Sequence, residues 1–203
     1  TRIICIASPN NPSGVGVSRE TIERIAAAAP EASILVDECY FEYSRFTVAD
    51  LLNQYPNLLI TRTFSKTWGI PSLRFGYLLA HRENIHALLS VRGPYDINQL
   101  AIVAARAALD NPDYTRDYVA EVMDQAKPLL ERFLRERGVH FWPSCANYLW
   151  VFPDAPEEVE RGLREKDILV RPKADHGGRL GLRVTVGSVT QTESLIAALQ
   201  SLI

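Results

Sequence analysis

The chain has 203 residues, of which 47% are hydrophobic and 23% charged, and its formal net charge is −2. This length suffices for one large domain, or for one domain with a smaller annex. No apolar run approaches the ~20 residues that a membrane helix needs, and the balanced charges create no field that would attract nucleic acid or anionic lipid. We therefore expect neither nucleic acid nor a membrane as a partner.

The cysteines and histidines argue against a disulfide framework and a metal site. Cys5, Cys39 and Cys145 are odd in number and widely spaced, without a C-x-x-C pair. His81 and His86 are five residues apart, not the four that would place two imidazoles on one helix face. We expect buried free thiols in a reducing compartment, a cytoplasmic location and no metal.

The first third of the chain alternates short apolar runs with a helical pattern. The runs predict strands at residues 2–7, 33–37, 58–62 and 75–80, and Ser18 is the expected N-cap of a helix between the first two. Short apolar strands separated by a helix or a crossover are typical of a parallel sheet covered on both faces.

The middle of the chain is predicted to be helical. Apolar residues recur at helical spacing over 82–90, 98–109 and 114–137, and Gly138 is the expected stop. Because proline removes a donor and crowds the preceding turn, we expect a kink at Pro128.

From residue 139 the pattern becomes α+β. Strands are expected at 147–152, 168–170 and 182–186, with helices at 156–166 and 190–202, the last one starting with a capping box over Thr190–Glu193. The predicted fold class is therefore α/β. We expect part of a large domain with a mostly parallel sheet and flanking helices over 1–112, a long connecting helix over 113–138, and a small α+β domain over 139–203.

Three polar clusters follow the first three predicted strands. They are Asn11-Pro-Ser-Gly14, Asp37-Glu-Cys-Tyr40 and Thr63-Phe-Ser-Lys66, with Arg74 eight residues further on. Ligands of open parallel sheets bind outside the carboxyl ends of the strands, so we expect these clusters to converge.

Each cluster alone has an ordinary structural explanation. The first is a good β-turn, and Asp37 could cap a loop. Lys66 could be a solvated surface lysine, as most lysines are. Together, however, an acid, a phenol, hydroxyls, an arginine and a lysine complement an anionic, heteroaromatic aldehyde.

In order and spacing these motifs resemble the fold-type I, class I/II aminotransferases that depend on pyridoxal 5'-phosphate (PLP). The similarity is closest to the histidinol-phosphate aminotransferase group. It extends over the whole chain and includes the segments D-E-C-Y and T-F-S-K-T-W-G-I-P-S-L-R-F-G-Y, as well as Gly181-Leu-Arg-Val-Thr-Val-Gly187 near the end.

The resemblance implies a role for each cofactor residue. Lys66 would be the catalytic residue, bound covalently to PLP, first a nucleophile and then a proton carrier. Asp37 would keep the pyridine nitrogen protonated. Asn11 and Tyr40 would hydrogen-bond the ring's 3′ oxygen.

Further residues would hold the phosphate and the substrate. The cofactor phosphate would be bound by Thr63, Ser65 and Arg74. Arg183 would bind the carboxylate of the substrate, for which a planar guanidinium is well suited. Arg171 resembles a second anion contact, for the substrate phosphate. Asn147 either lines the substrate side or makes a hydrogen bond at the start of a strand.

The implied function is transamination between histidinol phosphate and 2-oxoglutarate in histidine biosynthesis, by a homodimer. A related PLP-dependent decarboxylase of threonine phosphate shares these motifs and remains an alternative. Because the chain opens on Thr1 inside an apolar run and its one methionine is Met123, we expect a fragment or a truncated homologue. A non-catalytic truncated homologue is therefore the third possibility.

Overall fold

The computed structural model describes residues 1–203 and divides them into two compact units. The first unit comprises Thr1–Pro9 and Gly16–Thr115, and the second comprises Asn10–Val15 and Arg116–Ile203. The short segment Asn10–Val15 thus belongs with residues more than a hundred positions later in the chain. The ranges 1–112, 113–138 and 139–203 stay a prediction.

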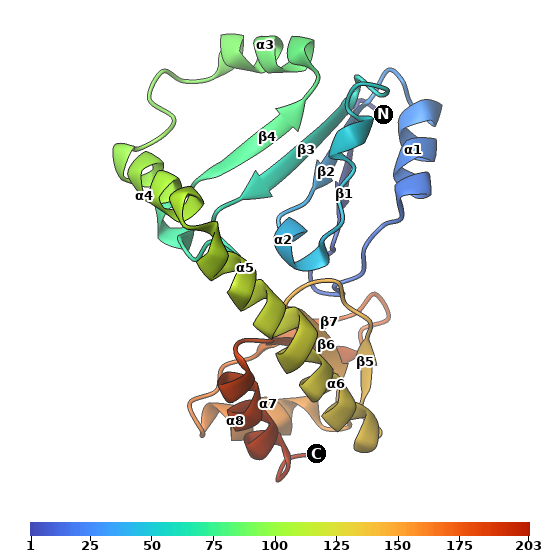
Figure 1. The fold of residues 1–203 in the computed structure, drawn as a ribbon. Coiled ribbons are helices and arrows are strands. Elements are labelled where there is room, and N and C mark those ends of the chain that lie inside the picture. The colour runs from blue at the N-terminus through green and yellow to red at the C-terminus, as the bar shows by residue number, and fades with distance from the viewer. The chain divides into compact units, whose positions relative to one another are not determined.

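The first unit is built on a four-stranded sheet in the order β1–β2–β3–β4 (Figure 1). Its strands are β1 (Ile3–Ala7), β2 (Ser33–Asp37), β3 (Leu58–Thr63) and β4 (Gly76–Ala80). Its helices are α1 (Arg19–Ala28), α2 (Phe41–Ser44), α3 (Arg82–Val91) and α4 (Gln99–Asp110), with 3-10 turns η1 (Ala49–Leu51) and η2 (Pro71–Leu73). Helix α5 (Pro112–Ala120) begins in this unit and continues into the second.

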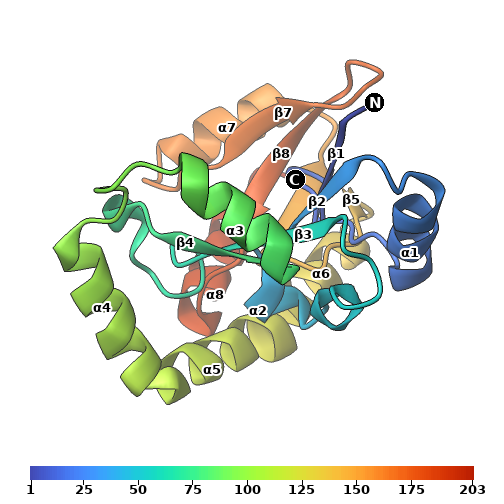
Figure 2. The ribbon, with the colours of Figure 1, turned by 90° about the horizontal axis from the view of Figure 1, so that it is seen from above.

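The expected parallel sheet is present, with one strand reversed. β1, β2 and β3 are parallel, whereas β4 runs antiparallel to β3, with Gly76 opposite Thr63. Helix α1 begins as expected after Ser18, whose hydroxyl accepts a hydrogen bond from the Thr21 amide. Along the sheet, α1 lies on the β1 side and α4 on the β4 side (Figures 1 and 2).

Within residues 1–203, the strand β1 is covered on one face only. Apolar residues of α1, η1 and the strands form the core on one face; they include Ile22, Ile34, Val36, Leu51 and Ile60. On the other face of β1, Cys5 is exposed and Ile3 is 62% exposed. No element of this chain packs there, so the Cys5 thiol is exposed rather than buried. Cys145 is exposed as well, and Cys39 is half-buried.

A buried ion pair joins the carboxyl ends of β2 and β3. The Glu38 side chain is fully buried, and its carboxylate accepts hydrogen bonds from Arg62 at 2.9–3.0 Å. It also accepts from the Thr47 hydroxyl and, at 2.9 Å, from the Val48 amide. The Arg62 guanidinium lies 3.5 Å from the centre of the Phe41 ring. Every oxygen of this buried charge therefore has donors, as burial of a charge requires.

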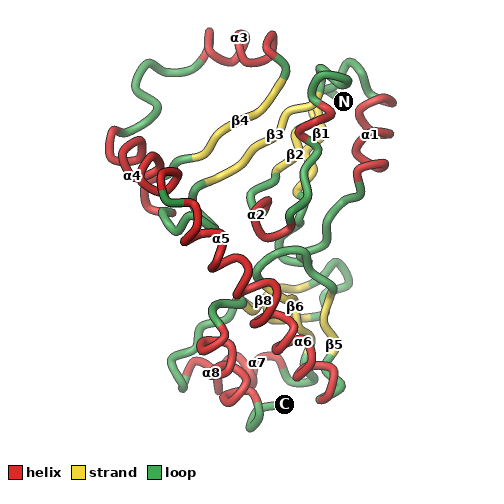
Figure 3. Tube along the Cα trace, viewed as in Figure 1, coloured by secondary structure: helices red, strands yellow, loops and turns green.

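The second unit consists of helices packed on an antiparallel sheet. Figure 3 shows its strands in yellow. Its antiparallel sheet has the order β5–β6–β8–β7. The elements are a π-helical turn η3 (Glu121–Ala126), α6 (Lys127–Glu136), β5 (His140–Trp142), β6 (Tyr148–Phe152), α7 (Pro156–Arg164), β7 (Arg171–Ala174), β8 (Leu180–Thr185) and α8 (Val189–Leu199). Leu130, Leu134 and Leu163 of the helices pack with Val151 and Leu182 of the sheet.

Pro128 does not break the long helix. Instead the turn before it widens into η3, in which the Lys127 amide donates to the Val122 carbonyl, five residues earlier. Since proline lacks an N–H and crowds the carbonyl four residues back, a wider turn accommodates it. Gly138, with φ +67°, ends α6 as expected.

Two predictions for the second unit placed an element at the wrong position in the sequence. The run 168–170 is a loop, because Ile168 donates to the Leu163 carbonyl in the turn that ends α7, and the strand begins only at Arg171. The capping box that starts α8 is formed by Ser188 and Gln191, not by Thr190–Glu193. Both sequences fit the capping pattern, and the earlier pair is the one used.

No helix in residues 1–203 is both long enough and apolar enough to cross a membrane.

We expect Arg62→Met to lower the free energy of unfolding by about 3–5 kcal/mol, because it leaves the buried Glu38 carboxylate without its cation. Urea unfolding followed by circular dichroism measures this. Arg19→Met is the matched control, since Arg19 pairs with Asp50 on the surface and its loss should change stability far less. A loss no larger than that of Arg19→Met would contradict a stabilising role for the pair.

Candidate active site

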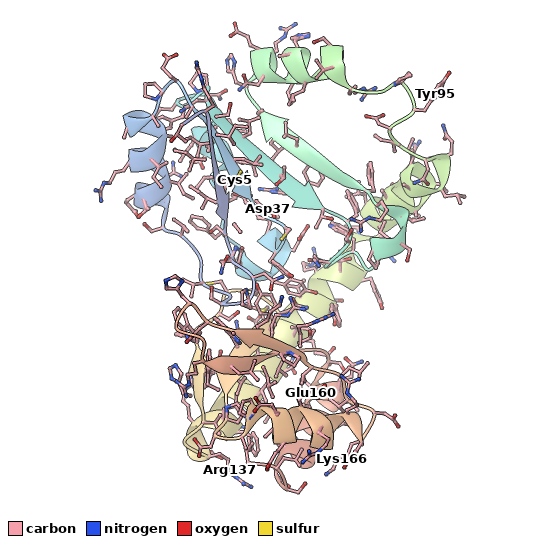
Figure 4. The ribbon with its side chains drawn as sticks, turned by 180° about the vertical axis from the view of Figure 1, so that it is seen from behind. Cys5, Asp37, Tyr95, Arg137, Glu160 and Lys166 are labelled. Atoms are coloured by element: carbon pink, nitrogen blue, oxygen red, sulfur yellow. The ribbon has the colours of Figure 1, made fainter.

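Asp37, Tyr40 and Lys66 come together at the carboxyl ends of β2 and β3. Asp37 is the last residue of β2 (Figure 4), and its carboxylate accepts a hydrogen bond of 3.0 Å from the Thr61 hydroxyl of β3. Tyr40 is buried at the start of α2. The exposed Lys66 amine lies 5.6 Å from the centre of the Tyr40 ring. An acid, a phenol and a primary amine thus lie at the carboxyl ends of these two strands.

Thr63 is the last residue of β3, and the loop after it carries Ser65 and Arg74. The Ser65 amide donates to the Thr63 hydroxyl at 3.0 Å, and the Phe64 amide donates to the Phe75 carbonyl at 3.1 Å. This bond extends the β3–β4 pairing by one residue, so Ser65 and Arg74 occupy neighbouring positions just beyond it. Two hydroxyls and a guanidinium therefore lie close together along the backbone.

Arg74 has an unusual backbone for a residue with a side chain. Its φ of 52° and ψ of 49° place it in the left-handed region at the end of η2. Its guanidinium is exposed and donates to the Pro71 carbonyl at 2.9 Å. A left-handed conformation costs a non-glycine residue about 1 kcal/mol. Arg45 adopts the same conformation at the end of α2, so in Arg74 it marks the end of the η2 turn.

Cys39 lies between Asp37 and Tyr40 but is a poor nucleophile. Burial, followed by the negative charge of Asp37, raises the pKa of the Cys39 thiol to about 12. The thiolate is the reactive form. The Cys39 thiol is therefore not an available nucleophile near neutral pH.

Asn11 belongs to the second unit, where Arg183 binds it. The Arg183 guanidinium donates to the Asn11 amide oxygen at 2.8 Å, and its central carbon lies 5.4 Å from the centre of the Tyr148 ring. The Tyr148 hydroxyl donates to the Asn10 carbonyl at 2.8 Å. The convergence of Asn11 with Asp37 and Lys66 stays a prediction.

The loop of Asn11 packs closely on the segment before β6. The Cys145 amide donates to the Gly14 carbonyl at 2.7 Å. Gly14 has φ +74°, and a side chain there would collide with Ser144. Lys127 of α6 in turn donates to the Ser144 carbonyl, and burial lowers the pKa of its amine. Helix α6 therefore supports the loop that carries Asn11.

Arg171 and Arg183 lie directly opposite each other on β7 and β8. Together with Arg164 they line a cavity of about 310 Å³, and Arg164 itself is paired with Glu160. The Nε–H of Arg183 is buried without a hydrogen-bond partner. Like charges opposite each other on neighbouring strands are destabilising. This cavity therefore favours a ligand with negative charge.

Asn147 immediately precedes β6 and is half-buried. Its carbonyl accepts a hydrogen bond of 2.8 Å from the Val186 amide. This backbone bond agrees with the strand-start interpretation of the segment, and a role for the Asn147 side chain toward substrate stays a prediction.

Three residues of these sites were not found from the sequence. They are Thr61, which binds Asp37, Tyr148, which lies beneath Arg183, and Glu42, which binds the residues after Lys66. Alternation along β3 makes Thr61 the residue facing Asp37 once the register is known. Tyr148 and Glu42 depend on contacts between distant segments, for which the sequence carries no local signal.

The model of the family "Aminotransferase class I and II" matches residues 1–200. The chain belongs to this family, whose members depend on PLP.

Among curated proteins, the histidinol-phosphate aminotransferase of Gloeobacter violaceus is 39% identical over 99% of this chain and 56% of its own length. That of a Geobacillus strain is 36% identical over 100% of the chain and 57% of its own length. The chain thus spans a little over half the length of the curated relatives it matches.

Solved structures show the same fold. The histidinol-phosphate aminotransferase from Clostridium acetobutylicum has a TM-score of 0.89 at 21% identity, covering 100% of this chain and 64% of its own. The enzyme of that name from Sinorhizobium meliloti, in complex with pyridoxal-5'-phosphate, has a TM-score of 0.82 at 24% identity, covering 100% and 59%. The L-threonine-O-3-phosphate decarboxylase from Porphyromonas gingivalis has a TM-score of 0.83 at 24% identity, covering 100% and 64%.

We expect iodoacetamide at about pH 8 to alkylate the exposed Cys5 and Cys145 and to spare Cys39. With its pKa near 12, about one Cys39 thiol in ten thousand is ionised at that pH. Its labelling should rise about tenfold per pH unit, as measured by peptide mass spectrometry. All three thiols should react in urea. Equal rates for Cys39 and Cys5 in the folded chain would refute the burial effect.

Proposed function

We propose that this chain carries the lysine-bearing part of a PLP-dependent aminotransferase. The observation that carries the proposal is the Lys66 amine beside the Tyr40 ring, at the strand edge where Asp37 ends β2. The order of these residues in the sequence and membership of the family support the same conclusion. Since the chain spans a little over half of its curated relatives, the activity of the whole protein is part of the proposal.

The donor set of the first unit fits PLP. A primary amine suits the aldehyde, an anionic carboxylate suits the protonated pyridine nitrogen, and a phenol suits the ring oxygen. The phosphate needs cations and hydrogen-bond donors, and the loop after β3 offers them in Ser65 and Arg74, with Thr63 holding the Ser65 amide. When bound, PLP supplies an electron sink for the pair left at the substrate's α-carbon.

Lys66 holds the cofactor and then moves a proton at the substrate's α-carbon. Its exposed amine is accessible to an incoming carbonyl group. Asp37, which accepts a hydrogen bond from Thr61, would hold a proton on the pyridine nitrogen. Tyr40 would hydrogen-bond the 3′ oxygen of the ring, and the family resemblance implies the same role for Asn11.

The substrate class follows from the two opposed arginines. A pair of guanidinium groups on β7 and β8, one with an unpaired buried N–H, suits a substrate with negative groups. We propose that Arg183 binds a carboxylate and Arg171 a phosphate or a second carboxylate, with Asn147 on the same side. We further propose histidinol phosphate, bound through its phosphate, as the amino donor and 2-oxoglutarate, bound through its carboxylates, as the acceptor. The names of the curated relatives support this choice.

The whole protein is further proposed to be a cytoplasmic homodimer. Aminotransferases are generally dimeric, and the curated relatives are bacterial proteins named for a biosynthetic reaction.

The arginine pair also suits threonine phosphate, which carries both a carboxylate and a phosphate. A PLP-dependent decarboxylase is therefore the second candidate within the same site chemistry, and a non-catalytic homologue is the third.

We expect the chain mixed with PLP to show the visible absorption of lysine-bound cofactor, and Lys66→Ala to lose it. A matched control, Lys166→Ala, changes an exposed lysine of the second unit and should retain it. Absence of this absorption in the unmodified chain would exclude an active enzyme made of these residues alone.

For the full-length protein, chromatography should detect amino transfer from histidinol phosphate to 2-oxoglutarate. Carbon dioxide release from threonine phosphate would instead identify the decarboxylase. Arg183→Lys should raise KM for 2-oxoglutarate about tenfold or more, because lysine cannot bind a carboxylate through two N–H groups.

A further inference from the structure

Glu42 connects α2 to the two residues that follow Lys66. One of its carboxylate oxygens accepts a hydrogen bond of 3.0 Å from the Thr67 hydroxyl, and the other accepts one of 2.9 Å from the Trp68 indole N–H. Thr67 is buried, and Trp68 is half-buried. Both carboxylate oxygens are thus used by residues 25 and 26 positions away.

This connection completes the support of the Lys66 loop. Before the lysine, the Thr63 hydroxyl holds the Ser65 amide. After it, the Gly69 amide donates to the Lys66 carbonyl at 3.2 Å. The Trp68 ring packs on Phe64, with ring centres 5.4 Å apart. These contacts lie within the loop itself, whereas Glu42 ties the loop to another element.

The element to which Glu42 ties the loop is the one that carries Tyr40. Tyr40 is the residue from which α2 starts, and Glu42 stands in the first turn of that helix. The Lys66 amine lies 5.6 Å from the Tyr40 ring. A lysine side chain has four rotatable bonds and is easily misplaced, so its reach depends on where the backbone after it is held.

We propose that Glu42 is a positioning residue: through Thr67 and Trp68 it fixes the Lys66 backbone relative to Tyr40 and Asp37, and so sets how readily the Lys66 amine bonds to an aldehyde cofactor. This inference rests on the proposed function, because it concerns Lys66 as the PLP-bearing lysine. Hydrogen bonds to a charged carboxylate are stronger than neutral ones, and the two donors restrain the two residues that follow the lysine.

The test measures where PLP attaches to the chain, without any turnover. The chain is mixed with PLP, the product is reduced with borohydride at short times, and the labelled peptides are quantified by mass spectrometry. Lys166, an exposed lysine of the second unit (Figure 4), serves as an internal reference for nonspecific labelling. The readout is the ratio of the initial labelling rates of Lys66 and Lys166.

We expect Glu42→Ala to lower this ratio about tenfold, since it removes both charged hydrogen bonds. Glu42→Gln, which keeps one acceptor oxygen, should lower it about threefold. Trp68→Phe keeps the ring but loses its N–H, and it should have an effect of similar size. The double variant Glu42→Ala with Trp68→Phe should lower the ratio no further than Glu42→Ala alone, because Glu42→Ala already removes the bond that Trp68→Phe removes.

The matched control is Glu83→Gln, at an exposed glutamate in the first turn of α3 of the same unit, and it should leave the ratio unchanged. Circular dichroism and thermal unfolding identify any variant that fails to fold, and Glu42→Gln and Trp68→Phe carry the test if Glu42→Ala does so. A general structural role would lower the unfolding temperature without selectively lowering Lys66 labelling.

The outcomes separate this inference from the proposed function. If the unmodified chain labels Lys66 no faster than Lys166, the proposed function fails and the inference fails with it. If the unmodified chain prefers Lys66 and the folded Glu42 and Trp68 variants keep that preference, the inference alone is overturned. A preference that is lost in Glu42→Ala and partly kept in Glu42→Gln supports it.

Discussion

The first unit depends on one buried charge, the carboxylate of Glu38. A carboxylate taken out of water must be matched by donors and by a cation, or it destabilises the fold strongly. Arg62, Thr47 and the Val48 amide meet this requirement. Because Glu38 follows β2 and Arg62 belongs to β3, meeting it also fixes how the ends of the two strands lie against each other.

Because side chains alternate along β2 and β3, the buried ion pair also determines where Asp37 lies. Side chains one position apart point to opposite faces of a sheet, so Asp37 and Thr61 pair on one face while Glu38 and Arg62 pair on the other. The Glu38 carboxylate is fully buried against Arg62, whereas the Asp37 carboxylate is half-buried. Two adjacent acids thus have different environments.

The parts of the fold that local patterns determine could be predicted from the sequence. The apolar run Ser33–Asp37 has the predicted bounds, and Ser18 caps α1 as expected. Predictions failed where two local solutions compete. Ser188 and Thr190 each begin a possible capping box. The apolar run before Arg171 starts with Ile168, whose amide is hydrogen-bonded in the turn that ends α7. Exposure of Cys5 depends on which elements cover β1, which the pattern of one strand does not reveal.

The same limit applies to the site. The order of the motifs indicated Lys66, Asp37 and Tyr40, and parallel strands bring them to one edge. The contacts of Asn11 with Arg183 and of Glu42 with Trp68 join segments far apart in the chain. Such contacts depend on tertiary packing, so a family resemblance can suggest them only as roles.

The left-handed backbone of Arg74 affects which substitutions selection would favour at this position. Glycine would adopt the same conformation without the steric cost, so Arg74→Gly would relax the turn while removing the cation. With the phosphate-binding role proposed above for Arg74, stability and ligand binding would oppose each other at this position. A search for thermostable variants that ignores ligand affinity would tend to replace Arg74, whereas a search for tighter phosphate binding would retain it.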